Sequence, residues 1–309
     1  MKKIKSVISV DKLTLCYLAS SELIVRLNEI NELIDTDGCF RLVRIPIDEA
    51  LFANCFRVLI KIPKENGECG YVEKEFATLK TKSHSKDGNK KNYVWLYIDN
   101  WVFYETFIVA YGNRCNWLGS VDYIADELKL IFNNITSMDI ALDSNVDIAK
   151  KIKHAQFCDD YTVKLNGKIR RNREEILNNI LYISTGDQIK MRTTSVVVKP
   201  LKQNGLSLKV YNKTDELEKS FKEYIPKWIN LNSTVYRTEV TLKNEHLKEF
   251  YAHKGESIPN ELLLTTLANQ NESQSVLSEM LHYFTDRLLM FNFNPEHRGK
   301  GKTLSIFEL

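Results

Sequence analysis

The chain contains 309 residues, of which 43% are hydrophobic and 27% are charged. These fractions are typical of a globular protein, so they exclude a mainly disordered or fibrous chain, and the length allows one large domain or two ordinary ones. The 43 lysines and arginines and the 40 acids give a net charge of +3, which by itself indicates no partner.

The first half of the chain predicts mainly strands. Segments rich in β-branched and aromatic residues lie at 13–19, 39–47, 54–63 and 92–107. A helix is expected at 20–34, because Leu23, Leu27, Ile30 and Ile34 keep helical spacing. A second helix is expected from Ser120 to Phe132, followed by a strand at 136–144.

The second half repeats this strand–helix–strand order. A strand at 206–212 leads into a helix capped by Thr214, and a strand at 234–243 follows. The remaining residues look mostly helical, with an amphipathic helix near 276–289. We therefore expect an α+β fold with antiparallel sheets, helices packed on one face and a helical C-terminal region, divided into residues 1–244 and 245–309.

No apolar run is long enough to span a membrane, and the basic N-terminus lacks the apolar core of a signal peptide. The six cysteines contain no C-x-x-C pair and no zinc-finger spacing with histidine. Reduced thiols in a cytoplasmic protein that binds no membrane are the expectation.

Basic residues are concentrated in one segment. Residues 150–213 contain fourteen lysines and arginines and five acids, a local net charge of +9. Such a segment on an otherwise acidic chain suggests a surface for a polyanion, and a solvated basic face without a partner is the alternative. The candidate phosphate contacts are Lys168, Arg170, Arg171, Arg173, Lys190, Arg192 and Lys209.

Side chains alternate between the two faces of a strand, so each of three predicted strands has an apolar and a polar face. Asp139 and Asp143 share the polar face of the first strand. Lys209, Tyr211 and Lys213 share that of the second, and Arg237 and Glu239 share that of the third. Neighbouring strands would bring these groups onto one surface, although polar faces of antiparallel strands often simply meet water.

Together these groups could carry phosphodiester chemistry. Carboxylates suit Mg²⁺ or Mn²⁺, with Asp139 and Glu239 as the first choice of metal ligands and Asp143 as the reserve. Tyr211 is a candidate covalent nucleophile. Lys209, Lys213 and Arg237 would orient the phosphate.

Three motifs resemble those of the rolling-circle replication initiation factor family, also called Rep-trans. They are Thr136–Asp143 (TSMDIALD), Lys209–Glu216 (KVYNKTDE) and Arg237–Lys243 (RTEVTLK), in the order of the family's motifs. The resemblance covers roughly residues 92–250. The paired histidine motif of other nicking enzymes, H-x-H, is a different pattern and is absent here.

The resemblance implies a metal-dependent endonuclease that nicks and joins one strand of origin DNA. Tyr211 would become linked to the 5′ phosphate and leave a free 3′-OH, and Asp139, Asp143 and Glu239 would be the candidate metal ligands. Residues 1–244 would form the nicking and origin-binding domain. The implied partners are double-stranded origin DNA, single-stranded DNA, a second copy of the chain, and a host helicase and polymerase.

Two alternatives remain open. Ser137 and Asn212 depart from the family's arginine and acid, and this favours a non-catalytic DNA-binding protein of the same fold. An RNA-binding or RNA-processing protein is the third possibility, because sheets with basic and aromatic faces also bind RNA.

Overall fold

The structure is a computed structural model of the whole chain. It describes residues 6–35, 37–47, 49–64, 69–86, 89–104, 117–170, 173–185, 192–199, 205–220, 234–257, 259–295 and 301–309. None of the helices within these ranges combines the length and the apolarity needed to cross a bilayer. Every cysteine within them is a free thiol, whereas Cys115 lies outside.

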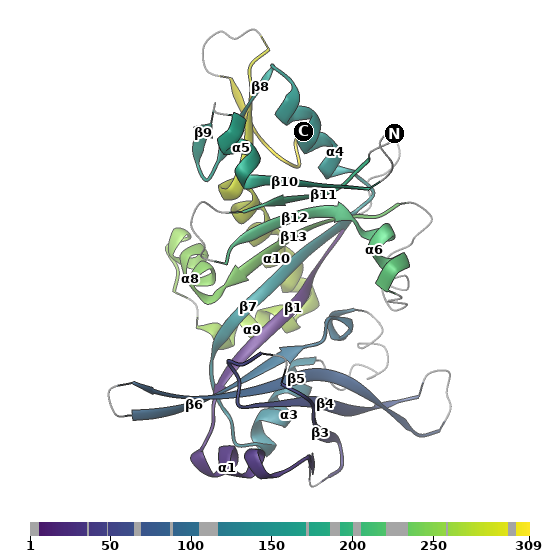
Figure 1. Ribbon diagram of the computed structural model, residues 1–309, viewed down its shortest axis with the longest axis vertical. Coiled ribbons are helices and arrows are strands. Elements are labelled where there is room, and N and C mark those ends of the chain that lie inside the picture. The colour runs from purple at the N-terminus through teal and green to yellow at the C-terminus, as the bar shows by residue number, and fades with distance from the viewer. Residues whose placement is uncertain are drawn as a thin grey trace. The chain divides into compact units, whose positions relative to one another are not determined.

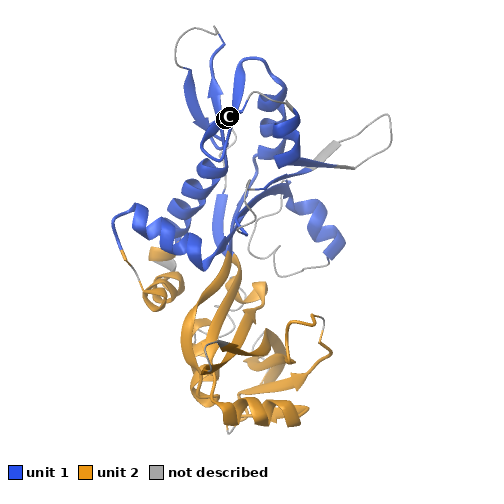
Figure 2. Cartoon of the chain, turned by 60° about the vertical axis from the view of Figure 1, so that its left-hand side comes forward, with its two compact units in different colours: residues 1–10, 139–256, 274–309 blue, residues 11–138, 257–273 orange. Residues whose placement is uncertain are grey.

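The chain folds into two compact units, each assembled from separate stretches of sequence (Figure 2). Unit 1 consists of residues 1–10, 139–256 and 274–309, and unit 2 of residues 11–138 and 257–273. Two long strands, β1 (Ser6–Leu18) and β7 (Ile131–Ser144), contribute residues to both units. This division differs from the expected one at residue 245, because residues 274–309 belong to the same unit as residues 139–256.

Unit 2 is built on an antiparallel sheet (Figure 1). Its strands follow the order β1, β6, β5, β4, β3, β2. The bounds are β2 (Glu32–Ile34), β3 (Phe40–Arg44), β4 (Asn54–Pro63), β5 (Tyr71–Lys86) and β6 (Asn89–Ile98). The helices are α1 (Ser21–Glu29), α3 (Trp117–Glu127) and α9 (Asn260–Ala268), with a 3₁₀ turn at Asn100–Phe103.

Unit 1 contains two groups of strands. The first follows the order β10 (Ile180–Thr185), β11 (Arg192–Val198), β12 (Ser207–Asn212), β13 (Tyr236–Lys243) and β7. The second follows the order β15 (Lys302–Ser305), β14 (Leu289–Phe293), β8 (Tyr161–Leu165) and β9 (Lys168–Arg170). The helices are α4 (Ile148–Phe157), α5 (Arg173–Asn179), α6 (Lys213–Ser220), α8 (Asn244–His253) and, from residue 274 on, α10 (Gln270–Leu288).

These elements confirm the α+β class, the antiparallel pairing and the C-terminal helices. The amphipathic pattern near 276–289 is the buried face of α10, where Leu277, Met280, Leu281, Phe284 and Leu288 are almost inaccessible. The C-terminal region also holds β14 and β15, which the helical expectation missed.

Two expected helices end earlier than their spacing predicted. The first stops at Glu29, because Arg44 donates to the carbonyls of Ile30 (2.9 Å) and Asn28 (3.1 Å) and closes the helix end. The second stops at Glu127, because Lys129 adopts a left-handed φ of 50° that a helix cannot continue. Strands β2 and β7 therefore begin inside the expected helices.

Candidate active site

The pairing of β12 with β13 brings the predicted polar residues together in unit 1. The register places Lys209 opposite Glu239 and Tyr211 opposite Arg237. Directly opposed residues of an antiparallel pair project from the same face, so these four side chains share one side of the sheet. The opposite face is apolar, with Leu208, Val210, Val240 and Leu242 fully buried.

Tyr211 and Lys209 both form hydrogen bonds to the carboxylate of Glu239. The phenol donates a hydrogen bond to Oε2 of Glu239 at 3.2 Å, and the ammonium of Lys209 contacts Oε1 at the same distance. Glu239 is only 5% exposed at its side chain, whereas Lys209 is 42% exposed and Tyr211 is half-buried. A buried acid therefore holds a phenol and an ammonium that both reach toward solvent.

Arg237 does not take the phosphate-binding role expected from the sequence. Its Nε and Nη2 donate to the two oxygens of Asp143, each at 2.7 Å, and the side chains are 0% and 1% exposed. Such a two-point pair fixes β13 against β7. The buried pair makes Arg237 a positioning residue, and Asp143 is its counter-ion.

Lys213, which follows the end of β12, also differs from its expected role of orienting the phosphate. Lys213 is buried, contacts Oε2 of Glu216 and places its ammonium 5.8 Å from the centre of the Tyr211 ring. Asn212 accepts a hydrogen bond from the backbone of Asp215 and so caps α6. The expected cap, Thr214, instead accepts from the backbone of Val235 at 2.9 Å. Glu216 was not predicted, although its spacing of three residues from Lys213 was a signal.

The carboxylates do not form a complete metal site. Asp139 and Glu239 are buried oxygen ligands of the type that Mg²⁺ prefers. In the described parts of the chain, however, no three acidic, histidine or cysteine side chains form a group able to hold a metal. Arg237 binds both oxygens of Asp143, and Lys209 and Tyr211 bind those of Glu239. A cation at Asp139 and Glu239 would need further oxygen ligands, which water or a bound phosphate could supply.

The basic segment is divided between different elements of unit 1. Lys168 is exposed on β9, and Arg170 on the same strand forms an ion pair with Glu175 at 2.6 Å. Arg171 and Lys190 lie outside the described residues, as do the side chains of Arg173 and Arg192. Of the predicted phosphate contacts, Lys209 therefore shares the carboxylate of Glu239 with Tyr211. Lys168 and Arg170 lie on the four-stranded group.

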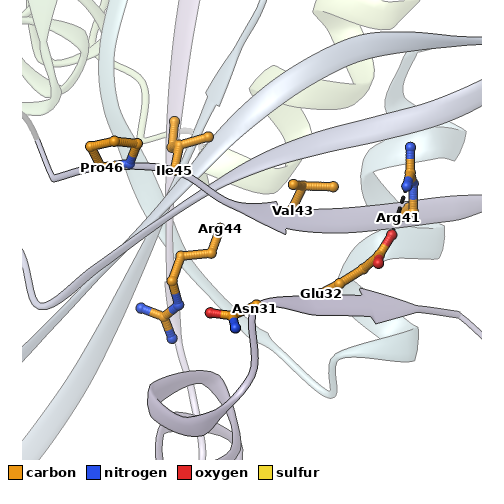
Figure 3. Close-up of a pocket in the computed structure, with 7 residues that line it drawn as sticks. All are labelled: Asn31, Glu32, Arg41, Val43, Arg44, Ile45 and Pro46. Carbon is orange, nitrogen blue, oxygen red and sulfur yellow. Dashed lines mark hydrogen bonds and ion pairs between the residues drawn. The ribbon is translucent and has the colours of Figure 1, made fainter.

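One pocket of about 510 Å³ lies in unit 2, and its lining residues are Asn31, Glu32, Arg41, Val43, Arg44, Ile45 and Pro46 (Figure 3). Arg41 is held by Glu32 at 2.6 Å and by Glu73 at 2.5 Å. Arg44 is occupied by the carbonyls at the end of α1. Both guanidinium groups are therefore committed to the fold, and we assign no ligand to this pocket.

Comparisons with known proteins give one structural similarity. No protein-family model matches the chain, and no curated protein matches it. Among solved structures, the chain is similar to a rolling circle replication initiator protein from Geobacillus stearothermophilus, with 10% identity and a TM-score of 0.47. The match covers 96% of this chain and 89% of that chain. A similarity of this degree assigns neither an activity nor a ligand.

Proposed function

We propose that the protein initiates rolling-circle replication by nicking and rejoining one strand of origin DNA, with Tyr211 as the nucleophile. The hydrogen bond of 3.2 Å from Tyr211 to Glu239 is the observation that carries the proposal. A nucleophilic hydroxyl needs an acceptor for its proton, and a buried carboxylate beside it meets this need. The ordered resemblance of three motifs supports the same assignment.

The proposed step is an exchange of two phosphorus–oxygen bonds. The Tyr211 oxygen bonds to phosphorus as the bond from phosphorus to the 3′-oxygen breaks. The phenolic proton passes to Glu239, and the 3′-oxygen takes a proton from the ammonium of Lys209, which contacts the other oxygen of Glu239. The 5′ phosphate stays on the tyrosine, and the reverse reaction rejoins the strand.

Arg237 and Asp143 contribute by positioning. Because Arg237 lies opposite Tyr211 and is held by Asp143 from β7, the buried pair fixes the strand that carries Glu239. Lys209 is then the basic side chain that meets a phosphate, since it is exposed and Lys213 is buried.

A non-catalytic DNA-binding protein is the second candidate. It is favoured by the burial and ion pairing of Arg237 and Lys213, which leave fewer cations for the phosphate than the sequence predicted. The two candidates differ in whether DNA becomes covalently attached.

The test uses a supercoiled plasmid that carries the element's origin, with Mn²⁺ present. The wild-type protein should give nicked circles with protein attached. Tyr211→Phe should give none, and Glu239→Gln should slow the reaction by about 10²–10⁴-fold. Tyr236→Phe, the same change at a half-buried tyrosine on the adjoining strand, should react like the wild type. Binding without any covalent product in the wild type would establish the second candidate.

A further inference from the structure

The sheet of unit 2 has one closed face and one partly open face. Val94, Leu96 and Ile98 of β6 are buried on the closed face. The same face carries Phe40, whose ring packs against Tyr123 of α3 with centroids 6.1 Å apart. The alternate residues of β6 are Tyr93, Trp95 and Tyr97, and each of these side chains is half-buried on the open face. Three large aromatic rings thus follow one another along a single strand.

The strand register adds cations to this row of rings. Trp95 pairs with Lys80 of β5, Tyr93 pairs with Lys82, and Lys91 pairs with His84. Paired residues project from the same face, so lysines and a histidine lie directly beside the aromatic side chains. His84 and Lys91 are exposed, and Lys82 is half-buried. We call Tyr93, Trp95, Tyr97, Lys82 and Lys91 the aromatic face.

The rings are held in place by their neighbours. Tyr93 and Trp95 have centroids 5.7 Å apart, and Phe52 meets Trp95 edge-on at 5.6 Å. Lys80 lies 5.2 Å from the centre of the Tyr97 ring and forms an ion pair with Glu49 at 3.1 Å. Lys80 therefore packs against the rings and is held there by Glu49. Lys82 and Lys91 extend the face toward the end of the hairpin formed by β5 and β6 (Figure 1).

We propose that the aromatic face is a binding platform for single-stranded DNA. Unpaired bases stack on aromatic side chains, and cations beside the rings neutralise the phosphates. Duplex DNA hides its base faces inside the helix, so the rings would gain nothing from it. The choice of DNA over RNA rests on the proposed function, since nicking releases a DNA single strand. The stacking itself rests on the geometry of β5 and β6 alone.

The test measures fluorescence anisotropy of a labelled oligothymidylate of about 15 nucleotides. Tyr211→Phe protein serves as the host in every arm, so that strand cleavage does not disturb the measurement. Trp95→Leu and Tyr93→Leu should each weaken binding by about tenfold or more. Tyr71→Leu is the matched control, because this 67% exposed tyrosine lies about 30 Å away along β5.

A second pair of variants tests the cations. Lys91→Ala should weaken binding and reduce its dependence on salt. Lys90→Ala removes the same charge from the opposite face of the same strand and should have a smaller effect. Lys90 and Lys91 are both exposed, so these variants fold even if a ring substitution does not.

Three results would overturn the platform. They are unchanged affinity in the ring variants with an unchanged thermal midpoint, equal effects of Lys90→Ala and Lys91→Ala, and tighter binding of oligouridylate than of oligothymidylate. None of these depends on the nicking reaction. Failure of the proposed function would instead appear as intact oligonucleotide binding without a covalent product in protein that retains Tyr211.

Discussion

Asp143 and Arg237 lie 94 residues apart in the sequence and form a two-point ion pair, with both nitrogen–oxygen distances at 2.7 Å and almost no exposure of either side chain. The pair joins β7 and β13, whose polar faces we expected from the sequence to form one surface. Its burial shows that this part of the polar surface is packed away from solvent, whereas Lys209 and Tyr211 on β12 are only partly buried.

Breaking this pair should destabilise the protein strongly. Asp143→Asn leaves the buried guanidinium without its counter-charge, and we expect the free energy of unfolding to fall by about 3–5 kcal/mol. Urea unfolding measures the loss. The double variant Asp143→Leu with Arg237→Met should lose less, because neither charge then remains buried alone.

An exposed pair in the same unit is the control for that experiment. Lys254 and Glu279 are 2.7 Å apart, with side chains 33% and 48% exposed. Glu279→Gln should cost less than about 1 kcal/mol, because solvent screens the exposed charges. Equal losses for Glu279→Gln and Asp143→Asn would contradict the structural role given to the buried pair.

His246 should make the stability of the protein sensitive to mild acid. Burial lowers the pKa of this histidine; Glu245 opposes the shift, and Arg287 and Lys243 add to it. Its Nδ1 accepts a hydrogen bond from the backbone N–H of Lys243 at 2.9 Å, which caps α8 and requires the neutral ring. Stability is therefore complete above the unfolded pKa of about 6.5 and is lost as the pH falls through the lower folded pKa.

The variant His246→Gln distinguishes the effect of the helix cap from the effect of protonating the ring. His246→Gln keeps an acceptor for the Lys243 N–H but cannot be protonated, so its unfolding midpoint should change less than that of the wild type below about pH 6.5. His253→Gln, at an exposed position of the same helix, should follow the wild type. Parallel pH profiles for wild type and His246→Gln would remove His246 as the cause.

Metal dependence stays a prediction, and Asp139 provides its test. Arg237 holds both oxygens of Asp143, so a cation would be held by Asp139 and Glu239, with its further oxygens supplied by water or by the DNA phosphate. Asp139→Asn should then raise the Mn²⁺ concentration needed for nicking by about tenfold or more. Nicking that persists in the presence of a chelator would show that the reaction needs no metal.

The alternation of residues along strands allowed much of the arrangement of the candidate site to be predicted, whereas the roles of its residues stay predictions. Asp143, Lys209, Tyr211, Arg237 and Glu239 were assigned to shared faces, and the structure brings them together as hydrogen-bonded neighbours. Alternation cannot show whether a polar face is covered. The buried roles of Arg237 and Lys213 therefore came only from tertiary packing.

The aromatic row of β6 was present in the sequence as alternating rings in the stretch NYVWLYI. Its partner strand β5 was not among the strands expected from the sequence. Only the register of β5 with β6 shows that Lys82 and Lys91 flank the rings. Local sequence patterns do not encode long-range strand pairing, so they could not place these lysines beside the rings.

The interleaving of the two units also constrains the order of folding during translation. Strand β8 gains its partner β14 only after residues 289–293 have been synthesised, more than a hundred positions later. Strands β2 to β6 are contiguous and can pair as soon as they leave the ribosome. Unit 2 should therefore acquire most of its sheet early, while the four-stranded group of unit 1 closes last.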